Sequence, residues 1–408
     1  MTHLQSLMQS KKSESYPIPD GDLLSYNFDL NYLEQYHSNL NFNIHYNDKE
    51  LFSRRGEALI NNRKIQTPAL WLGHVMGGRP HPWKFLDIKT IIVNAADILR
   101  TKSNTNSICE NGIHKHLDFN GAILMDSGGF LFQKKDDLDI DPLLIIDLYE
   151  KSKPDLGVIL DHPFNPSETN KANQKRWKKT LENTKIMVKN KGKVDLMPVV
   201  HGYNPKELKK ACDDIKKIIP EPTMVGIGSL VPLLFRTNGT KRFKDPIKFV
   251  IDAIRIVQEE FPNSFLHAFG IGSSKTMHLM YSLGVDSLDS TSWRLKAAYG
   301  VIQLPGVADR HPLSRNNGRS FLNEKEKKLL NKCQCPSCKN LSINKRLNTL
   351  NDQFSARAIH NAHVFLTEQK KFQDKIKNGK TKDFTQKRLN SGIFLKAFKY
   401  ILEKKEFN

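Results

Sequence analysis

The sequence lacks the features of a membrane or secreted protein. No apolar run reaches the roughly 18 residues that a membrane-spanning helix needs, and the first segment, MTHLQSLMQSKKSESYPIPD, has no apolar signal core. Cysteine is also scarce: the 408 residues include 5 cysteines, an odd number, and three of them are crowded into CQCPSC. This pattern argues against a disulfide framework and indicates a metal site. We therefore expect a cytoplasmic protein without a membrane partner.

Acidic residues are few relative to basic ones. The chain has 43 aspartates and glutamates against 63 lysines and arginines, which gives a formal net charge of +20 at pH 7. A charge of this size concentrates polyanions, and the usual partner is a nucleic acid. Solvated lysines in a lysine- and asparagine-rich sequence would give the same total, so the charge by itself leaves both interpretations open.

Apolar runs of strand length alternate with segments of helical spacing. The runs are Ala69–Gly73, Thr90–Asn94, Ala122–Asp126, Leu156–Asp161, Asp195–His201, Met224–Gly228, Phe265–Gly270 and Val285–Asp289, and helices are expected over Ala172–Asn190, Pro205–Ile219, Pro246–Glu260 and Lys275–Leu283. Continuous apolar strands separated by helices are typical of a parallel sheet covered by helices. The fold class is therefore α/β, and the pattern predicts a (β/α)8 barrel of the TIM type, with a doubly wound open sheet as the alternative. A hairpin turn at Asn61-Asn62 is expected to lead into the first strand.

We divide the chain into three parts. Residues 1–51 form an N-terminal extension to which the sequence assigns no function, residues 52–315 form the barrel, and residues 316–408 form a zinc-binding subdomain and a basic helical tail. In the third part the predicted zinc ligands are Cys333, Cys335, Cys338 and His360. Four protein ligands close a tetrahedral shell, so this Zn²⁺ is expected to be structural rather than catalytic. His363 is the alternative fourth ligand, and redox-active cysteines are the alternative to a metal site.

The carboxyl ends of the predicted strands carry most of the candidate site residues, and barrel enzymes place their catalytic groups at that end. These residues are Asp126, Asp161, His201, Gly228, Ser229, Gly270 and Asp289. Asp289 is the candidate nucleophile, although an aspartate before Ser and Thr is also an ordinary helix N-cap. Asp126 precedes Gly128 and Gly129, which would let a flat ligand approach the backbone, and Phe130, which offers a ring for stacking. A structural turn that begins at Asp126 would explain the same residues without a ligand.

Three further segments each allow a functional and a structural interpretation. Backbone N–H groups around Gly228 are expected to hold a carbonyl oxygen of a substrate, and His201 is either a binding residue or a packing residue. The helix after Asp161 carries basic residues on both sides of Trp177, which suits a phosphate backbone or a solvated surface equally. Its basic residues are Lys171, Lys175, Arg176, Lys178 and Lys179.

Several motifs in order resemble the tRNA-guanine transglycosylase superfamily. They are DFNGAILMDSGGF, LDHPFNP, HGYNPKEL, GIGSLVPLL, HAFGIGS, GVDSLDSTSWRL and CQCPSC…IHN, from roughly Phe52 to Phe365. The resemblance implies a (β/α)8 barrel with a structural zinc and a base-exchange reaction on a nucleic acid. It implies that Asp289 is the nucleophile at C1′ and that Asp126 is the general acid and base. Base exchange with retention of configuration requires two carboxylates in these roles. It also implies a base-binding set of Asp161, Phe130, His201, Gly228, Ser229 and Phe269.

Some positions depart from the pattern of the tRNA enzymes. Leu131 and His201 stand where those enzymes have glutamine, the loop after the nucleophile is SWRLKAAYG with Arg294 and Lys296, and little sequence follows the zinc ligands. These departures resemble the DNA-guanine transglycosylase branch. They imply replacement of guanine in DNA by a 7-deazaguanine base such as 7-cyano-7-deazaguanine, with possible accessory DNA-handling proteins as partners. The alternatives are a transglycosylase acting on tRNA and a non-catalytic nucleic-acid-binding subunit.

The basic tail is a candidate surface for gripping a DNA duplex. Its cations are Lys370, Lys371, Lys375, Lys377, Lys380, Lys382, Lys387 and Arg388. A solvated helix would also explain their positions, so the sequence leaves both interpretations open.

Overall fold

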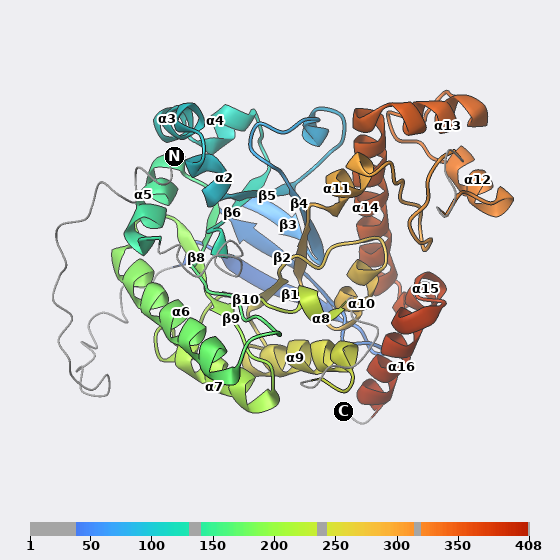
Figure 1. Ribbon diagram of the computed structural model, residues 1–408. Coiled ribbons are helices and arrows are strands. Elements are labelled where there is room, and N and C mark those ends of the chain that lie inside the picture. Colours follow the sequence, from blue (N-terminus) through green and yellow to red (C-terminus); the bar gives the residue numbers. More distant parts are fainter. Residues whose placement is uncertain (1–37, 130–139, 235–242, 314–319, 407–408) are drawn as a thin grey trace.

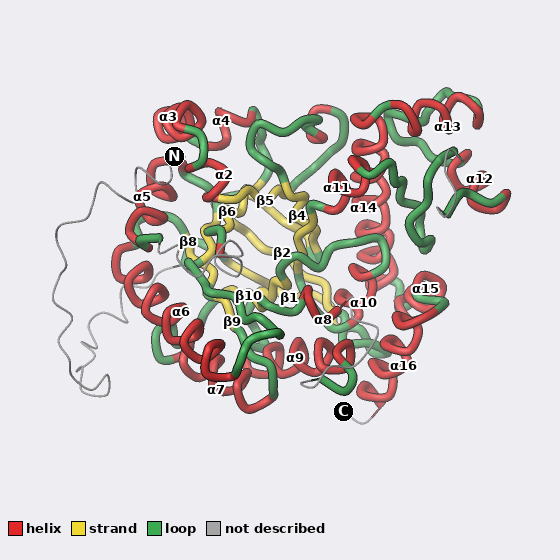
Figure 2. Tube along the Cα trace, in the orientation of Figure 1, coloured by secondary structure: helices red, strands yellow, loops and turns green. Residues whose placement is uncertain are grey.

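The computed structural model describes residues 38–129, 140–234, 243–313 and 320–406. Parallel strands stand at the centre of this part and helices surround them (Figures 1 and 2). The strands are β4 (Ala69–Gly73), β5 (Thr90–Asn94), β6 (Ala122–Asp126), β7 (Leu156–Val158), β8 (Asp195–Met197), β9 (Val199–Val200), β10 (Met224–Ile227), β11 (Phe265–Ala268) and β12 (Ser287–Ser290). They lie in the order β8-β7-β6-β5-β4-β12-β11-β10-β9.

The sheet closes because β8 and β9 are two parts of one strand. Only Pro198, which has no N–H to donate, separates them. β8 pairs with β7 on one side and β9 pairs with β10 on the other, while the Pro198 carbonyl accepts the N–H of Gly226 at 2.8 Å. The predicted barrel is thus confirmed, and the open sheet is excluded.

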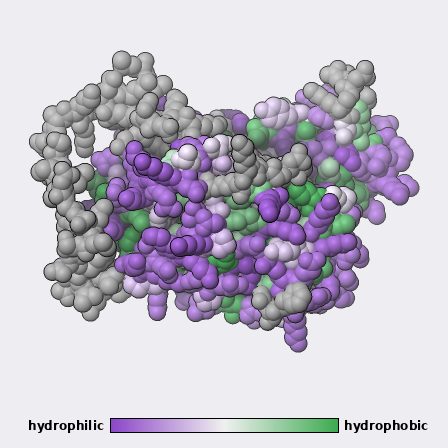
Figure 3. All heavy atoms as spheres, turned by 60° about the horizontal axis from the view of Figure 1, so that its bottom comes forward, coloured by the Kyte–Doolittle hydropathy of each residue, from purple (hydrophilic) through white to green (hydrophobic). Residues whose placement is uncertain are grey.

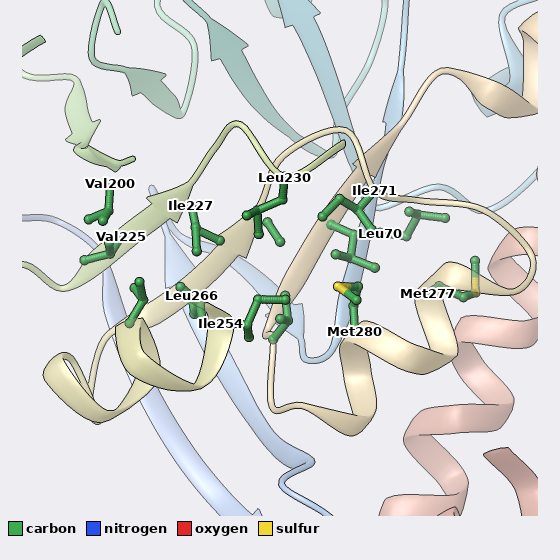
Figure 4. Packing of buried hydrophobic residues seen from close by; sticks show 14 of the residues in the cluster. Leu70, Val200, Val225, Ile227, Leu230, Ile254, Leu266, Ile271, Met277 and Met280 are labelled. Carbon is green, nitrogen blue, oxygen red and sulfur yellow. The ribbon is translucent and has the colours of Figure 1, made fainter. Parts of the chain in front are cut away.

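The barrel has an outer and an inner apolar layer because side chains alternate along each strand. Val225 and Ile227 of β10 point outward and pack with Ile254 of the surrounding helix and Leu266 of β11 (Figure 4). Inward-facing side chains, such as those of Trp71 and Phe265, form a second cluster in the lumen. The carboxyl end of this lumen is where the predicted acids end their strands.

A small antiparallel sheet closes the amino end of the barrel. It consists of β1 (Asn41–Asn47), β2 (Arg54–Ile60) and β3 (Arg63–Gln66), and its side chains Ile60 and Ile65 join the lumen cluster. The predicted hairpin is confirmed: Asn61 and Asn62 have φ of 49° and 65°, the positive angles of a type I′ turn.

Helices cover the outside of the barrel. They are α2 (Ala95–Leu99), α3 (Lys102–Asn111), α4 (Ile113–Leu117), α5 (Pro142–Ser152), α6 (Asn170–Asn190), α7 (Pro205–Lys216), α8 (Val231–Leu234), α9 (Pro246–Glu260), α10 (Thr276–Ser282) and α11 (Ser292–Ala298), with a 3-10 turn, η2 (Pro82–Lys84). Helices α5, α7 and α9 begin at a side-chain N-cap followed by proline, as at Asn204-Pro205. Among the described residues, hydrophilic ones cover most of the face in Figure 3, as expected for helices whose apolar sides face the barrel.

The C-terminal region packs beside the barrel. It comprises α12 (Glu324–Asn331), α13 (Ile343–Asp352), α14 (Phe354–Lys377), α15 (Thr381–Arg388) and α16 (Gly392–Glu406). The long helix α14 lies against α11 and runs along the right side of the barrel in Figure 1. Within the described ranges, no helix is both long and apolar enough to span a bilayer.

Candidate active site

A cavity of about 330 Å³ opens at the carboxyl end of the barrel, a volume in the range of small-molecule sites. Its lining residues come from strand ends around the barrel: Ile92, Asp126, Val158, Asp161, Pro163, Gly228, Ser229, Val231, Pro232, Phe269, Gly270, Asp289 and Thr291. The fold thus brings together Asp126, Asp161 and Asp289 from β6, the loop after β7, and β12. Of the other predicted site residues, His201 lies behind this lining and Phe130 falls outside the described residues.

Asp126 is held at the end of β6 by its neighbour on β5. Nδ2 of Asn94 donates to Oδ2 of Asp126 at 2.6 Å, and Oδ1 of Asn94 accepts the N–H of Ala96 at the start of α2. Burial, followed by the charges of Asp161 and Asp289, raises the pKa of Asp126 from 3.8 to about 7. A carboxyl group with a pKa near neutrality can both donate and accept a proton at physiological pH.

Asp289 is the next-to-last residue of β12, and one of its carboxylate oxygens is already engaged. The backbone N–H of Gly270, in the loop after β11, donates to Oδ1 at 2.5 Å. The residue at the N-cap of α11 is Thr291, so the alternative of Asp289 as a cap is wrong. With Oδ1 engaged by Gly270, Oδ2 is the oxygen better suited to attack a carbon in the cavity.

His267 is a residue that the sequence analysis missed. It lies fully buried in the lumen on β11, with Nδ1 2.7 Å from Oγ of Ser287 on β12. Nε2 faces Oδ1 of Asp289 at 3.4 Å, longer than a formed hydrogen bond. The motif HAFGIGS could have indicated this role. His267 lies two positions before Phe269, and alternate residues of a strand point to the same side.

Asp161 lies beyond the end of β7, which stops at Val158. Its carboxylate packs against Gly129, where a Cβ would overlap it. This contact explains the second glycine of DSGG by a close approach of two loops. The first, Gly128, has φ of 92°, a backbone angle that glycine adopts readily.

One of the backbone groups predicted to hold a substrate oxygen is already engaged. The N–H of Gly228 donates to the carbonyl of Val200 at 3.1 Å within the barrel, so this group is not available to a substrate oxygen. Gly228 and Ser229 nevertheless line the cavity. Phe269 lines it as well, with its ring perpendicular to His267 at a centroid distance of 4.4 Å.

A group of four potential metal ligands lies in the C-terminal region. The Sγ atoms of Cys333, Cys335 and Cys338 are 3.5, 3.7 and 3.5 Å from Nδ1 of His360, and all four ligand atoms lie within 4.8 Å of one another. Such separations suit a tetrahedral metal shell. Nε2 of His360 lies 3.0 Å from the carbonyl of Gln303, which orients the ring so that Nδ1 faces the cysteines. The alternative ligand, His363, instead contacts Thr367 and lies outside this group.

Two suggested nucleic-acid surfaces have a different arrangement from the expected one. Trp177 is buried and donates to Asp214, so it offers no ring for stacking on a base. In the tail, Arg388 and Lys371 contact the buried Glu368. Gln373 on α14 donates to backbone oxygens of Gln66 and Pro68, ahead of β4, which places this part of the tail at the amino end of the barrel, opposite the cavity.

Comparison with known proteins gives consistent matches. A family model described as queuine tRNA-ribosyltransferase matches residues 48–392. The tRNA-guanine(15) transglycosylase of Methanocaldococcus jannaschii is 27% identical over 356 residues, 84% of this chain and 50% of that protein. The protein of the same name from Pyrococcus furiosus is 28% identical over 364 residues, 87% of this chain and 58% of the relative. This chain therefore spans half to three fifths of the length of these relatives, and it belongs to the queuine tRNA-ribosyltransferase family.

Proposed function

We propose that this protein is a guanine transglycosylase that exchanges a base of a nucleic acid through a covalent Asp289 intermediate. The observation that carries the proposal is the meeting of three carboxylates in one cavity, where Asp126 has a pKa near 7. A proton carrier and a nucleophilic carboxylate are the pair needed for two successive displacements at an anomeric carbon. Family membership supports the same chemistry.

In the first displacement, Oδ2 of Asp289 forms a bond to C1′ of the nucleotide and the bond from C1′ to the base nitrogen breaks. The base leaves with the electron pair and takes a proton from Asp126. Asp289 is then a neutral ester, which removes one of the charges that raise the pKa of Asp126. The pKa of Asp126 therefore falls as its proton is needed.

In the second displacement, the incoming base loses a proton to Asp126 and attacks C1′ with its ring nitrogen. The ester bond breaks, and the electron pair returns to the Asp289 carboxylate. Both nucleophile and proton carrier are regenerated, so exchange needs no other co-reactant. We propose a 7-deazaguanine such as 7-cyano-7-deazaguanine as the incoming base.

Base recognition is assigned to the rest of the cavity. Asp161 would accept hydrogen bonds from the N1–H and the exocyclic amine of guanine, and Phe269 would cover one face of the ring. The family resemblance assigns the other face to Phe130, which lies outside the described residues. Gly228 and Ser229 form the wall between Asp161 and Phe269.

The four-ligand group would hold Zn²⁺ as a structural ion. Cys333, Cys335, Cys338 and His360 fill a tetrahedral shell and leave no position for a substrate. The ion would tie the segment after α12 to α14, which itself packs on α11 directly after the nucleophile. Its contribution is therefore to stability and to the position of α11.

For the polymer, the names of the family and of its relatives favour tRNA. The DNA hypothesis rests on the departures at Leu131, at His201 and in the loop with Arg294 and Lys296, and the comparisons do not support it specifically. The location of the tail at the amino end of the barrel also weakens the idea that its lysines grip a duplex beside the cavity. We therefore place tRNA first and DNA second.

Incubation of the purified protein with labelled guanine and either tRNA or duplex DNA tests both the base-exchange activity and the choice of polymer. Label in tRNA only would establish the first polymer, and label in DNA only would establish the second. Denaturing gels of the protein with unlabelled nucleic acid should show a covalent adduct that Asp289→Ala lacks. Absence of label in both polymers would contradict the transglycosylase assignment.

A further inference from the structure

His201 contacts one partner at each ring nitrogen. Nδ1 lies 2.9 Å from Oγ of Ser229, and Nε2 lies 2.9 Å from Oδ2 of Asp161. The second contact is close but imperfectly aligned, as is common in active sites before substrate binds. The His201 side chain is 0% exposed, whereas that of Asp161 is 10% exposed and lines the cavity. The histidine therefore does not line the cavity itself but contacts two residues that do, Asp161 and Ser229.

Asp161 and Ser229 together indicate which nitrogen of His201 carries the proton. Its Oγ accepts the backbone N–H of Phe164 at 2.8 Å, so its own hydrogen remains available for Nδ1 of His201. A proton on Nδ1 would instead turn the lone pair of Nε2 toward a carboxylate, which is repulsive. The neutral ring is thus expected to carry its proton on Nε2 and to donate it to Asp161.

The residues around the His201 ring restrict its position. Ser229 has φ of 67°, a left-handed conformation that costs a serine free energy. A Cβ on Gly228 would come within 2.5 Å of Cε1 of His201, so only glycine leaves room for the ring. Phe164 stacks on the ring at a centroid distance of 5.7 Å and an interplanar angle of 23°. A strained backbone around a histidine with a polar contact at each ring nitrogen indicates a positioned group rather than simple packing.

We propose that His201, fixed by Ser229, is a positioning residue that orients the Asp161 carboxylate toward the edge of a purine bearing both an N1–H and an exocyclic 2-amino group. This inference rests on the proposed function. Nε2 of His201 lies close enough to one Asp161 oxygen to form a charge-assisted hydrogen bond when the base enters, so the other oxygen would not need to reorient. His201 would then set the preference for guanine-type bases over hypoxanthine, which has the N1–H but not the amine.

Two substitutions at His201 separate orientation from packing. Glutamine extends as far as Nε2 and can still donate to Asp161, whereas asparagine extends only as far as Nδ1. We expect His201→Asn to lower kcat/KM for guanine by about 10- to 100-fold, as for the loss of a hydrogen bond to a charged group. The preference for guanine over hypoxanthine should fall toward one. His201→Gln should keep that preference within about 3-fold of the unmodified protein.

The measurement is incorporation of labelled guanine and of labelled hypoxanthine into the accepted polymer, with kcat and KM for each. His45→Gln, on the exposed side of β1, is the matched control and should change neither. A folded His201→Asn protein with an unchanged preference would overturn the inference. If the unmodified protein exchanges no base at all, the proposed function fails instead.

Two further measurements apply if His201→Asn does not fold. Ser229→Ala keeps the ring but removes its fixing hydroxyl, and it should reduce the guanine preference in the same direction. Nitrogen-15 NMR of the full-length protein, assigned with His201→Gln, should show His201 protonated on Nε2. Protonation on Nδ1 alone, or a Ser229→Ala preference equal to that of the unmodified protein, would overturn the inference.

Discussion

Replacement of Asp126 by asparagine should stabilise the protein while it abolishes base exchange. Burial and two neighbouring carboxylates raise the pKa of Asp126 from 3.8 to about 7. At pH 8 this corresponds to about 4 kcal/mol of unfavourable free energy for the charged form in the folded state. Because the carboxyl group lines the cavity, where solvent screens its charge, about 4 kcal/mol is an upper bound. Asparagine has the same shape and can still contact Asn94, but it carries no charge.

The gain in unfolding free energy from Asp126→Asn should grow as the pH rises. Between pH 3.8 and about 7 the folded protein holds a proton on Asp126 that the unfolded chain releases. Stability due to this group therefore falls as the pH rises through that window, and it is constant above the window. The gain from Asp126→Asn should be near zero below pH 4, about 2 kcal/mol at pH 5 and about 4 kcal/mol at pH 8.

Urea unfolding of the two proteins at pH 5 and pH 8 measures this gain. Asp213→Asn, an exposed position on α7, serves as the control and should give the same difference at both pH values. An Asp126→Asn protein that is less stable than the original at pH 8 would refute the reasoning. So would a gain that does not change with pH. The labelled-guanine assay should show loss of exchange in the same preparation.

Three other substitutions test separate parts of the site. Asp289→Ala should lower exchange by at least about 1000-fold and abolish the adduct; adduct remaining in this variant would exclude Asp289 as nucleophile. Cys335→Ser should lose the metal and at least about 3 kcal/mol of unfolding free energy, measured by elemental analysis and denaturation; a stable metal-free protein would contradict the structural role. His267→Phe should slow adduct formation about 10-fold with little change in KM, because Nε2 faces Asp289; an unchanged rate in a single-turnover assay would exclude that role.

The sequence by itself determined the barrel and most of its candidate chemistry. Apolar runs and helical spacing are local signals, so the predicted strands and helices agree with the structure within a few residues, as for α9 at Pro246–Glu260. The spacing of Cys333, Cys335 and Cys338 likewise predicted the ligand group with His360. Asp126, Asp161 and Asp289 were found because each follows an apolar run, and the carboxyl ends of parallel strands meet at one end of a barrel.

Only the tertiary structure decided what each of these groups touches. The contact of His201 with Asp161 and that of His267 with Asp289 join residues on different strands, and barrel closure sets which strands are neighbours. The raised pKa of Asp126 has the same origin, since it depends on burial and on charges brought together across the lumen. Trp177 shows the converse: a basic, aromatic segment suggested a nucleic-acid surface, and packing instead placed the ring inside. Local pattern fixes the elements, but the direction of a side chain at their ends depends on the neighbours that folding supplies.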